Sequence, residues 1–176
     1  TLHDIGVALS ATLDLEEVLD KALQAITARL SFDRAMILLV EERDGRRVLA
    51  SGRSIGGTPE MAALTKGLEF SLEAPDSFMA KVVLSGKPIL VRNIDEVRDE
   101  SARQYLAALQ TQGFLAVPLL TQGKTVGYLG LDNAVTDSPI PEAIQDLLST
   151  ISSQVAVAID RARLYQTLER RVQERT

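Results

Sequence analysis

Cysteine and tryptophan are absent from this 176-residue chain, and His3 is its single histidine. Without cysteine the chain can form no disulfide, thiolate metal site or cysteine nucleophile. Catalytic triads and histidine-ligated metal sites need a histidine within the fold, whereas His3 lies near the beginning of the sequence, outside the expected core. Aromatic residues make up 4% of the chain, which is poor material for stacking nucleic-acid bases. We therefore predict no catalytic residue and no metal site.

Basic charge and long apolar runs are lacking as well. The formal net charge is −5 at pH 7, so nothing favours nucleic acid or an anionic membrane as a partner, since both attract a basic surface. No uninterrupted apolar run approaches the roughly 18 residues that a membrane-spanning helix needs. A cytoplasmic protein fits these features best, and a hydrophobic content of 45% is ordinary for a globular core.

Apolar spacing and turn residues predict an α+β fold, with helices on the faces of one sheet. Asp14 is a typical N-cap for a helix over 15–30. Asp44-Gly45 is a strong hairpin signal between strands at 35–40 and 47–50. The other expected elements are a loop at 51–58, a helical turn at 59–66, strands at 68–72, 89–91, 114–120 and 125–132, and helices at 77–85, capped by Asp76, and 99–111. Pro118 should mark a strand edge or a bulge.

The last 36 residues predict one helix that is longer than the domain it leaves. Pro139 and Pro141 are placed to open it. A straight helix over 141–175 would be about 50 Å long, against about 30 Å for a small domain, so about 20 Å should extend outward. Its apolar residues alternate in steps of four and three, the spacing of a coiled coil: Ile144, Leu148, Ile151, Val155, Ala158, Ala162 and Tyr165, continued by Leu168 and Val172.

A second, shorter apolar stripe marks a helix near the beginning of the chain. The sequence starts at Thr1 without a methionine and ends without a glycine or proline, which favours a segment of a longer protein with helices at both ends. We expect the two terminal helices to associate with those of a second copy. The candidate dimer interface consists of Ile5, Leu9, Ile151, Val155, Ala158, Ala162, Tyr165, Leu168 and Val172.

A set of mostly aromatic and apolar residues around the expected sheet is the candidate small-molecule pocket. Its members are Phe70, Ser77, Phe78, Met79, Tyr105, Phe114 and Val117. Ser77, at the start of a helix, would place donors at the mouth of the pocket. Ordinary core packing accounts for the same residues, so the pattern leaves both interpretations open.

The pattern over residues 12–160 resembles a GAF domain, a sensor module of bacterial and eukaryotic signalling proteins. The likeness is carried by the helix opening Leu13-Asp14-Leu15-Glu16-Glu17-Val18-Leu19, by Gly86-Lys87-Pro88-Ile89-Leu90-Val91, and by the hairpin of Phe114-Leu115-Ala116-Val117-Pro118-Leu119 with Val126-Gly127-Tyr128-Leu129-Gly130-Leu131. The resemblance implies a six-stranded antiparallel sheet with helices on its faces, a ligand pocket on one face, and terminal helices that often form a parallel dimer bundle. Residues 164–169 are similar to linkers that lead from such domains into histidine kinase or cyclase output domains.

Departures from the family's marked chemistries predict that no cofactor binds. Phytochrome-like members attach a bilin through cysteine, and this chain has none. Haem-binding members use a pocket histidine, a place that His3 does not suit. Members that reduce methionine sulfoxide need cysteines. The Asn-Lys signature of cyclic-nucleotide binders is missing, since Asn93 precedes Ile94 and Asn133 precedes Ala134.

Three parts and two functional hypotheses follow. We expect a linker helix at 1–13, a GAF domain at 14–160, and at 161–176 a coiled-coil linker to an output domain. The first hypothesis is a non-catalytic sensor domain of a signal-transduction protein, such as a sensor histidine kinase, that relays an unidentified small molecule through dimeric terminal helices. The alternative is a ligand-free dimerisation spacer. An enzyme is disfavoured, because no pair of nucleophile and base is recognisable.

Overall fold

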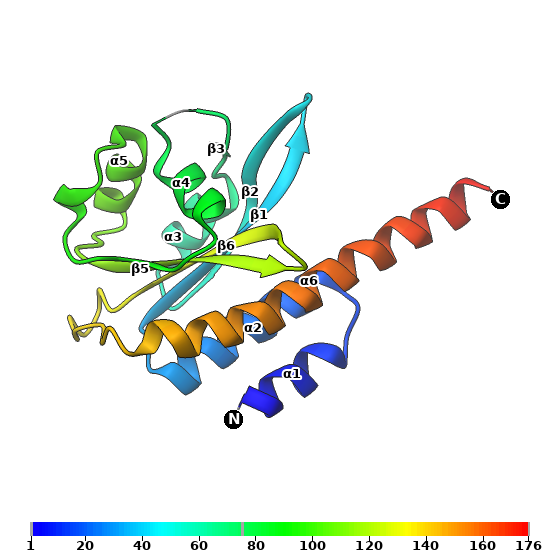
Figure 1. Cartoon of the computed structure of the whole chain (residues 1–176), viewed down its shortest axis with the longest axis horizontal. Coiled ribbons are helices and arrows are strands. Elements are labelled where there is room, and N and C mark those ends of the chain that lie inside the picture. The colour runs from blue at the N-terminus through cyan, green and yellow to red at the C-terminus, as the bar shows by residue number, and fades with distance from the viewer. Residues whose placement is uncertain (1, 75, 176) are drawn as a thin grey trace.

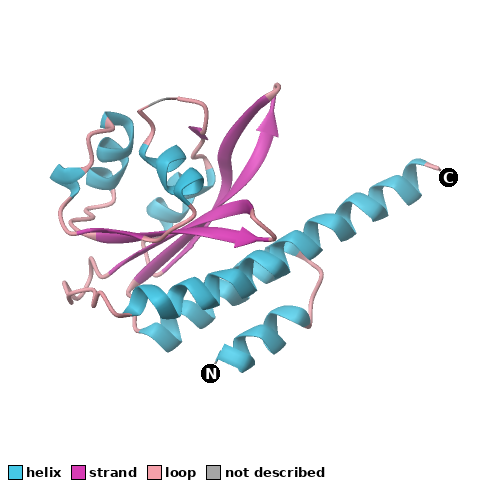
Figure 2. Ribbon diagram, in the orientation of Figure 1, coloured by secondary structure: helices cyan, strands magenta, loops and turns pink. Residues whose placement is uncertain are grey.

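A curled sheet between two layers of helices forms the body of the molecule (Figures 1 and 2). The computed structural model describes residues 2–74 and 76–175, without the side chains of residues 2–4. The strands are β1 (Arg34–Arg43), β2 (Arg46–Ile55), β3 (Phe70–Ser71), β4 (Ile89–Val91), β5 (Phe114–Thr121) and β6 (Lys124–Asp132). The helices are α1 (Leu2–Ser10), α2 (Leu15–Leu30), α3 (Pro59–Lys66), α4 (Phe78–Ser85), α5 (Glu100–Ala108) and α6 (Ile144–Glu174), with a 3-10 turn at Ile94–Glu96.

All six strands are antiparallel to their neighbours, in the order β3-β2-β1-β6-β5-β4. The predicted α+β fold with a six-stranded antiparallel sheet is therefore confirmed. Helices α2 and α6 cover one face, here called the long-helix face, and α1 packs on these two helices from outside (Figure 1). Helices α3, α4 and α5 lie over the other, the short-helix face. Of the described helices, α6 included, none has both the length and the apolar content to cross a membrane.

Two tight hairpins fix the register of the sheet. Asp44 and Gly45 join β1 to β2 with φ of 54° and 76°, and Gln122 and Gly123 join β5 to β6 with φ of 52° and 73°. Consecutive left-handed residues are typical of the type I′ turn, whose twist matches that of the flanking strands. The first hairpin lies at the predicted Asp44-Gly45 turn, and the second joins the strands predicted at 114–120 and 125–132.

Strand β2 is longer than expected. It continues through residues 51–55, so the prediction of a loop over 51–58 is wrong for that part. Gly52 reflects a close approach: a Cβ added there would lie 2.4 Å from the carbonyl oxygen of Thr65 in α3. Ser51 is left-handed, with φ of 54°, close to the irregularity in the pairing of β1 with β2. Glycine and serine therefore let a helix pack onto a bulged strand, an arrangement that their composition alone does not distinguish from a loop.

Helix caps differ from expectation in detail. The Asp14 carboxylate accepts a hydrogen bond from the Glu16 amide at 3.0 Å, as predicted for an N-cap. Ser77 rather than Asp76 caps α4, its hydroxyl accepting from the Ala80 amide at 3.1 Å. Helix α6 begins at Ile144, three residues after Pro141, because the chain first passes through a turn.

Pro118 lies at a locally free edge, as predicted. It is opposite Tyr128 in the pairing of β5 with β6, and on the other side β4 pairs only with residues 114–116. No ladder hydrogen bond is lost there, because β4 has already ended.

The two faces of the sheet hold different cores. Alternate strand residues point to opposite faces, and those of the long-helix face are mostly aliphatic: Leu115, Val117 and Leu119 of β5 pack with Leu129 and Leu131 of β6. The short-helix face holds Phe114 and Tyr128 together with Met79 and Val82 of α4. This face also contains the cavity described next.

Candidate ligand cavity and terminal helix

A cavity of about 50 Å³ lies between the sheet and helices α3, α4 and α5. Ligand pockets for drug-sized molecules are typically 300–1,000 Å³, so in this conformation the space suits a much smaller molecule. Its apolar lining includes Met36, Ile55, Met61, Met79, Leu106, Leu109, Phe114 and Leu131, and its polar lining includes Arg34, Ser54, Thr65, Tyr105, Thr111, Tyr128 and Asp132.

Three predicted pocket residues, Met79, Tyr105 and Phe114, line this cavity. Two more support the lining from behind. Phe70 packs edge-on against Tyr105 with ring centroids 5.8 Å apart, and Phe78 packs edge-on against Phe114 at 5.6 Å. Such edge-to-face pairs hold an aromatic wall in place.

The remaining two predicted residues are placed elsewhere. Val117 faces the long-helix core, because it lies an odd number of residues from Phe114 on the same strand. The hydroxyl of Ser77 is used in capping α4. The neighbouring Phe78 amide donates to the Asp99 carboxylate at 2.9 Å, so this helix start already has its acceptors.

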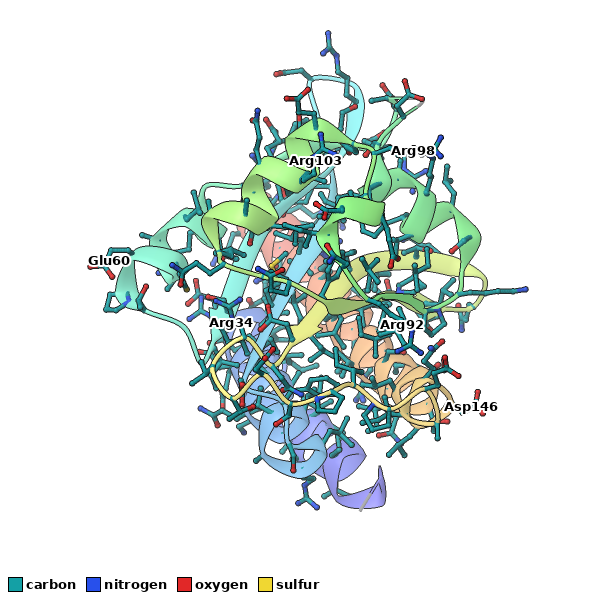
Figure 3. The ribbon with its side chains drawn as sticks, turned by 90° about the vertical axis from the view of Figure 1, so that its left-hand side faces the viewer. Arg34, Glu60, Arg92, Arg98, Arg103 and Asp146 are labelled. Carbon is teal, nitrogen blue, oxygen red and sulfur yellow. The ribbon has the colours of Figure 1, made fainter. Side chains whose placement is uncertain are left out.

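The polar end of the cavity is a buried ion pair between neighbouring strands. Arg34 of β1 donates through Nε and one terminal nitrogen to the two carboxylate oxygens of Asp132 of β6, at 2.8 and 2.7 Å. Both residues are at least nine-tenths buried. Figure 3 shows Arg34 below Arg103 of α5 and above the helices of the opposite face.

Every N–H group of the Arg34 guanidinium has a partner. Besides Asp132 it donates to the carbonyl oxygen of Leu109 at 2.9 Å, to the hydroxyl of Thr111 at 3.0 Å and to the sulfur of Met61 at 3.2 Å. Thr111 in turn donates to Asp132 at 3.0 Å. The hydrogen bonds that Arg34 donates to the Asp132 carboxylate raise the pKa of Arg34, and their effect exceeds the opposing effect of burial. The pair is thus neutral as a unit and fully satisfied.

Two tyrosine hydroxyls reach the same cavity. Tyr128 is 1% exposed, and burial raises its pKa far above the ordinary value. Burial also raises the pKa of Tyr105, whose hydroxyl lies 3.0 Å from the Met36 sulfur, a weak acceptor. The Tyr128 hydroxyl has no hydrogen-bond partner within residues 2–74 and 76–175. Both phenols therefore stay protonated at neutral pH and face the cavity as donors.

The sequence interpretation missed Arg34, Asp132 and Tyr128. Arg34 and Asp132 are 98 residues apart, each at the end of an apolar run, and only the register of β1 with β6 brings them opposite. The sequence signal that could have found the pair is a single basic residue at the end of one apolar strand and a single acidic residue at the end of another. Tyr128 shares the face of Phe114, a relation that follows from strand pairing and not from local spacing.

Most of the predicted dimer residues are covered within the same chain. Ile5, Leu9, Ile151, Val155, Ala158 and Ala162 are at most 6% exposed, because α1 and α2 pack on α6 and α6 packs on β5. Tyr165, Leu168 and Val172 are 42%, 59% and 64% exposed, beyond the point where α6 leaves the body of the molecule (Figure 1). Leu164, 58% exposed, adds to this outer stripe, defined here as residues 164, 165, 168 and 172.

Arg163 fastens α6 to the sheet just before the outer stripe begins. It donates to the carbonyl oxygen of Val40 in β1 at 2.8 Å and lies 3.7 Å from the Glu41 carboxylate. Burial lowers the pKa of Arg163. Strand β1 therefore contacts the cavity through Met36 and the exit of α6 through Val40.

The backbone of His3 lies in α1, but its side chain is outside the described residues. Within the described part of the chain, no three His, Cys, Asp or Glu side chains gather in a way that would hold a metal ion.

Comparison of the sequence with known proteins gives distant regulatory relatives. Over 143 residues the chain is 24% identical to the Nif-specific regulatory protein of Azospirillum lipoferum, a match that covers 79% of this chain and 22% of that protein. The chain thus spans about a fifth of the length of this relative.

Solved structures share the fold. The GAF domain of an Acinetobacter phosphoenolpyruvate-protein phosphotransferase has a TM-score of 0.71 and 22% identity, covering 93% of this chain and 92% of that domain. The GAF domain of a two-component sensor histidine kinase from Bacillus halodurans has a TM-score of 0.64 and 19% identity, covering 88% and 99%. The GAF domain family itself matches residues 14–159, so this chain belongs to the GAF domain family.

Proposed function

We propose that this chain is the sensor domain of a signal-transduction protein, in which a small molecule in the cavity changes the position of α6. The observation that carries the proposal is that one strand, β1, touches both sites: Met36 lines the cavity and Val40 holds Arg163. A ligand that fits two arrangements of β1 unequally would shift their populations, and α6 with them. Coupling of about 1.4 kcal/mol is enough for a tenfold change.

The relatives support a regulatory role over a catalytic one. One is named as a Nif-specific regulatory protein, and a structural neighbour is the GAF domain of a sensor histidine kinase. A histidine kinase is therefore the parent protein that we propose, with the isolated domain acting as its non-catalytic regulator.

The partner that we propose is a second copy of the chain, docked through the outer stripe. Exposed apolar residues at 164, 168 and 172 recur every four residues, so they form one face of the helix. This face has no cover from the rest of the described chain, whereas the inner half of α6 is already buried. The dimer contact therefore belongs to the outer half of α6 and not to the whole predicted seam.

Sedimentation equilibrium of matched α6 variants tests the dimer. Leu168→Glu should prevent self-association without lowering the free energy of unfolding, because Leu168 is 59% exposed in the monomer. Gln166→Glu is the control: it adds the same charge at an exposed position about 200° away around the helix. Val155→Asp should instead unfold the protein, because it would bury an unpaired charge in the long-helix core. A monomeric wild type at high concentration would contradict the dimer.

A thermal-shift screen against a metabolite library tests the sensor. A molecule present at 100 times its dissociation constant stabilises the folded state by about 2.7 kcal/mol. A dimer that binds no library member would instead favour the alternative, a ligand-free dimerisation spacer. That alternative has its own support, since the cavity is small and its ion pair is satisfied without a ligand.

A further inference from the structure

We infer that the cavity is built for an uncharged small molecule that carries a hydrogen-bond acceptor, such as a carbonyl oxygen, on an otherwise apolar body. This inference rests on the proposed sensor function and names the chemical class of its ligand. It is carried by three features of the lining: a closed ion pair, two donor hydroxyls and a set of flexible apolar side chains.

The ion pair leaves no binding capacity for a charged ligand. An anion would need N–H donors, but the five of Arg34 are directed to Asp132, Leu109, Thr111 and Met61. A cation would need free carboxylate oxygens, but Oδ1 of Asp132 accepts from Arg34 and the Ala134 amide, and Oδ2 accepts from Arg34 and Thr111. Either ion would bring an uncompensated charge into a buried site, which is costly.

Two tyrosine hydroxyls, beside the Ser54 hydroxyl at the strand β2 side of the lining, are the neutral donors considered for the ligand. Of the lining hydroxyls, Thr65 and Thr111 already donate to the Met61 carbonyl and to Asp132. The Tyr128 hydroxyl has no partner among the residues described, whereas the Tyr105 hydroxyl donates to the Met36 sulfur, a weak acceptor, and has the Thr65 hydroxyl as a second hydrogen-bond neighbour. An acceptor atom on the ligand would give the Tyr128 hydroxyl a hydrogen bond inside a cavity that is shielded from bulk water, where such a bond is favourable.

The rest of the wall suits a small apolar group of variable shape. The chain contains three methionines, and all three, Met36, Met61 and Met79, line the cavity. Methionine side chains are flexible and adapt to irregular contents. A water molecule needs about 10–15 Å³ of this kind of volume, so the cavity admits a ligand of about three to five non-hydrogen atoms before its walls move.

Methionine-methyl NMR tests the inference directly, because each ¹³C-methyl signal reports on the cavity wall. The probes are acetone, acetate and isopropylammonium, which have the same number of non-hydrogen atoms and differ in charge, together with xenon as an apolar probe. Acetone should shift the methionine signals saturably at neutral pH, whereas acetate and isopropylammonium should not.

Hydroxyl deletion identifies the donors. Tyr128→Phe and Tyr105→Phe should each weaken acetone binding about 2- to 10-fold and leave xenon binding unchanged, because they remove one hydrogen bond and retain the ring. Ser101→Ala, which removes an exposed hydroxyl of α5 outside the cavity lining, is the control and should leave both unchanged. If neither cavity variant weakens acetone binding, the tyrosines are not the donors and the inference is overturned.

Other outcomes separate this inference from the proposed function. Saturable binding of acetate or isopropylammonium would overturn the ligand class and leave the sensor function standing. If xenon binds and acetone does not, the proposed ligand class is also overturned, because the cavity would then be open to ligands without favouring a hydrogen-bond acceptor. If no probe, xenon included, shifts the signals, the cavity is closed to ligands and the proposed sensor function fails with it.

Discussion

The two faces of the sheet are packed differently, although the same strands form both. On the long-helix face, aliphatic side chains from α1, α2, α6, β5 and β6 fill the interior. On the short-helix face, aromatic rings, all three methionines and a buried ion pair surround a cavity. Close-packed interiors transmit strain, whereas methionine-rich walls adapt to their contents. In the sensor function that we propose, the short-helix face changes with its contents and the long-helix face carries that change to α6.

Breaking the ion pair between Arg34 and Asp132 on the short-helix face should lower the free energy of unfolding more than the other changes considered. Arg34→Met would leave the Asp132 charge buried without its partner, so we expect a loss of about 3–5 kcal/mol in the free energy of unfolding. Arg53→Met is the matched control, since Arg53 pairs with Asp20 in a more exposed place and should cost at most about 1 kcal/mol. Urea denaturation of both variants gives the comparison. Equal losses would show that burial does not set the importance of the pair.

Adding one methyl group on each side of β6 sharpens the contrast further. A Cβ at Gly127 would lie toward the long-helix face, 2.8 Å from the Leu38 carbonyl oxygen and 3.1 Å from Leu119, so Gly127→Ala should cost about 1–3 kcal/mol. A Cβ at Gly130 would lie toward the cavity, 3.2 Å from Cε1 of Tyr128 and 3.3 Å from Cγ of Met36, so its nearest contacts are side chains and not a backbone carbonyl. Because Met36 can move aside and the cavity leaves room beside Tyr128, Gly130→Ala should cost less than Gly127→Ala, about 1 kcal/mol. Thermal unfolding measures both, and a reversed order would contradict the assignment of the faces.

High pH should lower the free energy of unfolding through the tyrosines of the cavity. This effect should be smaller than those of breaking the ion pair and of the Gly127→Ala substitution. Burial raises the pKa of Tyr128 above that in the unfolded chain, so above about pH 10 the unfolded state binds fewer protons than the folded state. The stability is therefore complete at neutral pH and falls as pH rises, by up to about 1.4 kcal/mol per pH unit for one tyrosine. Unfolding free energies at pH 8, 10 and 11 should fall less steeply in Tyr128→Phe. An unchanged slope in that variant would assign the alkaline loss to other groups.

Local sequence signals predicted the frame of the fold well. Asp44-Gly45 and Gln122-Gly123 are turn pairs whose left-handed conformations follow from their chemistry. Asp14 at the start of α2 and Gly86, with φ of 68° at the end of α4, mark helix boundaries for similar local reasons.

The site was less predictable, because it depends on pairing between distant strands. Arg34 and Asp132 meet only through the register of β1 with β6. Val117 and Phe114 are three residues apart on β5 and so face opposite sides of the sheet, a relation that the alternation of strand residues predicts. The coiled-coil spacing of α6 correctly marked an apolar face. The same spacing occurs whether that face packs against the rest of its own chain or against a partner.

The anchorage of α6 at Arg163 has a geometric consequence. From Arg163 to Glu174 the helix rises about 16 Å, and Arg163 joins the start of this segment to the Val40 carbonyl oxygen of β1. A tilt of about 5° at that pivot moves the distal end by about 1.4 Å on this rise. A small displacement of β1 that tilts α6 at Arg163 would therefore move the distal end of α6 further than it moves β1 itself.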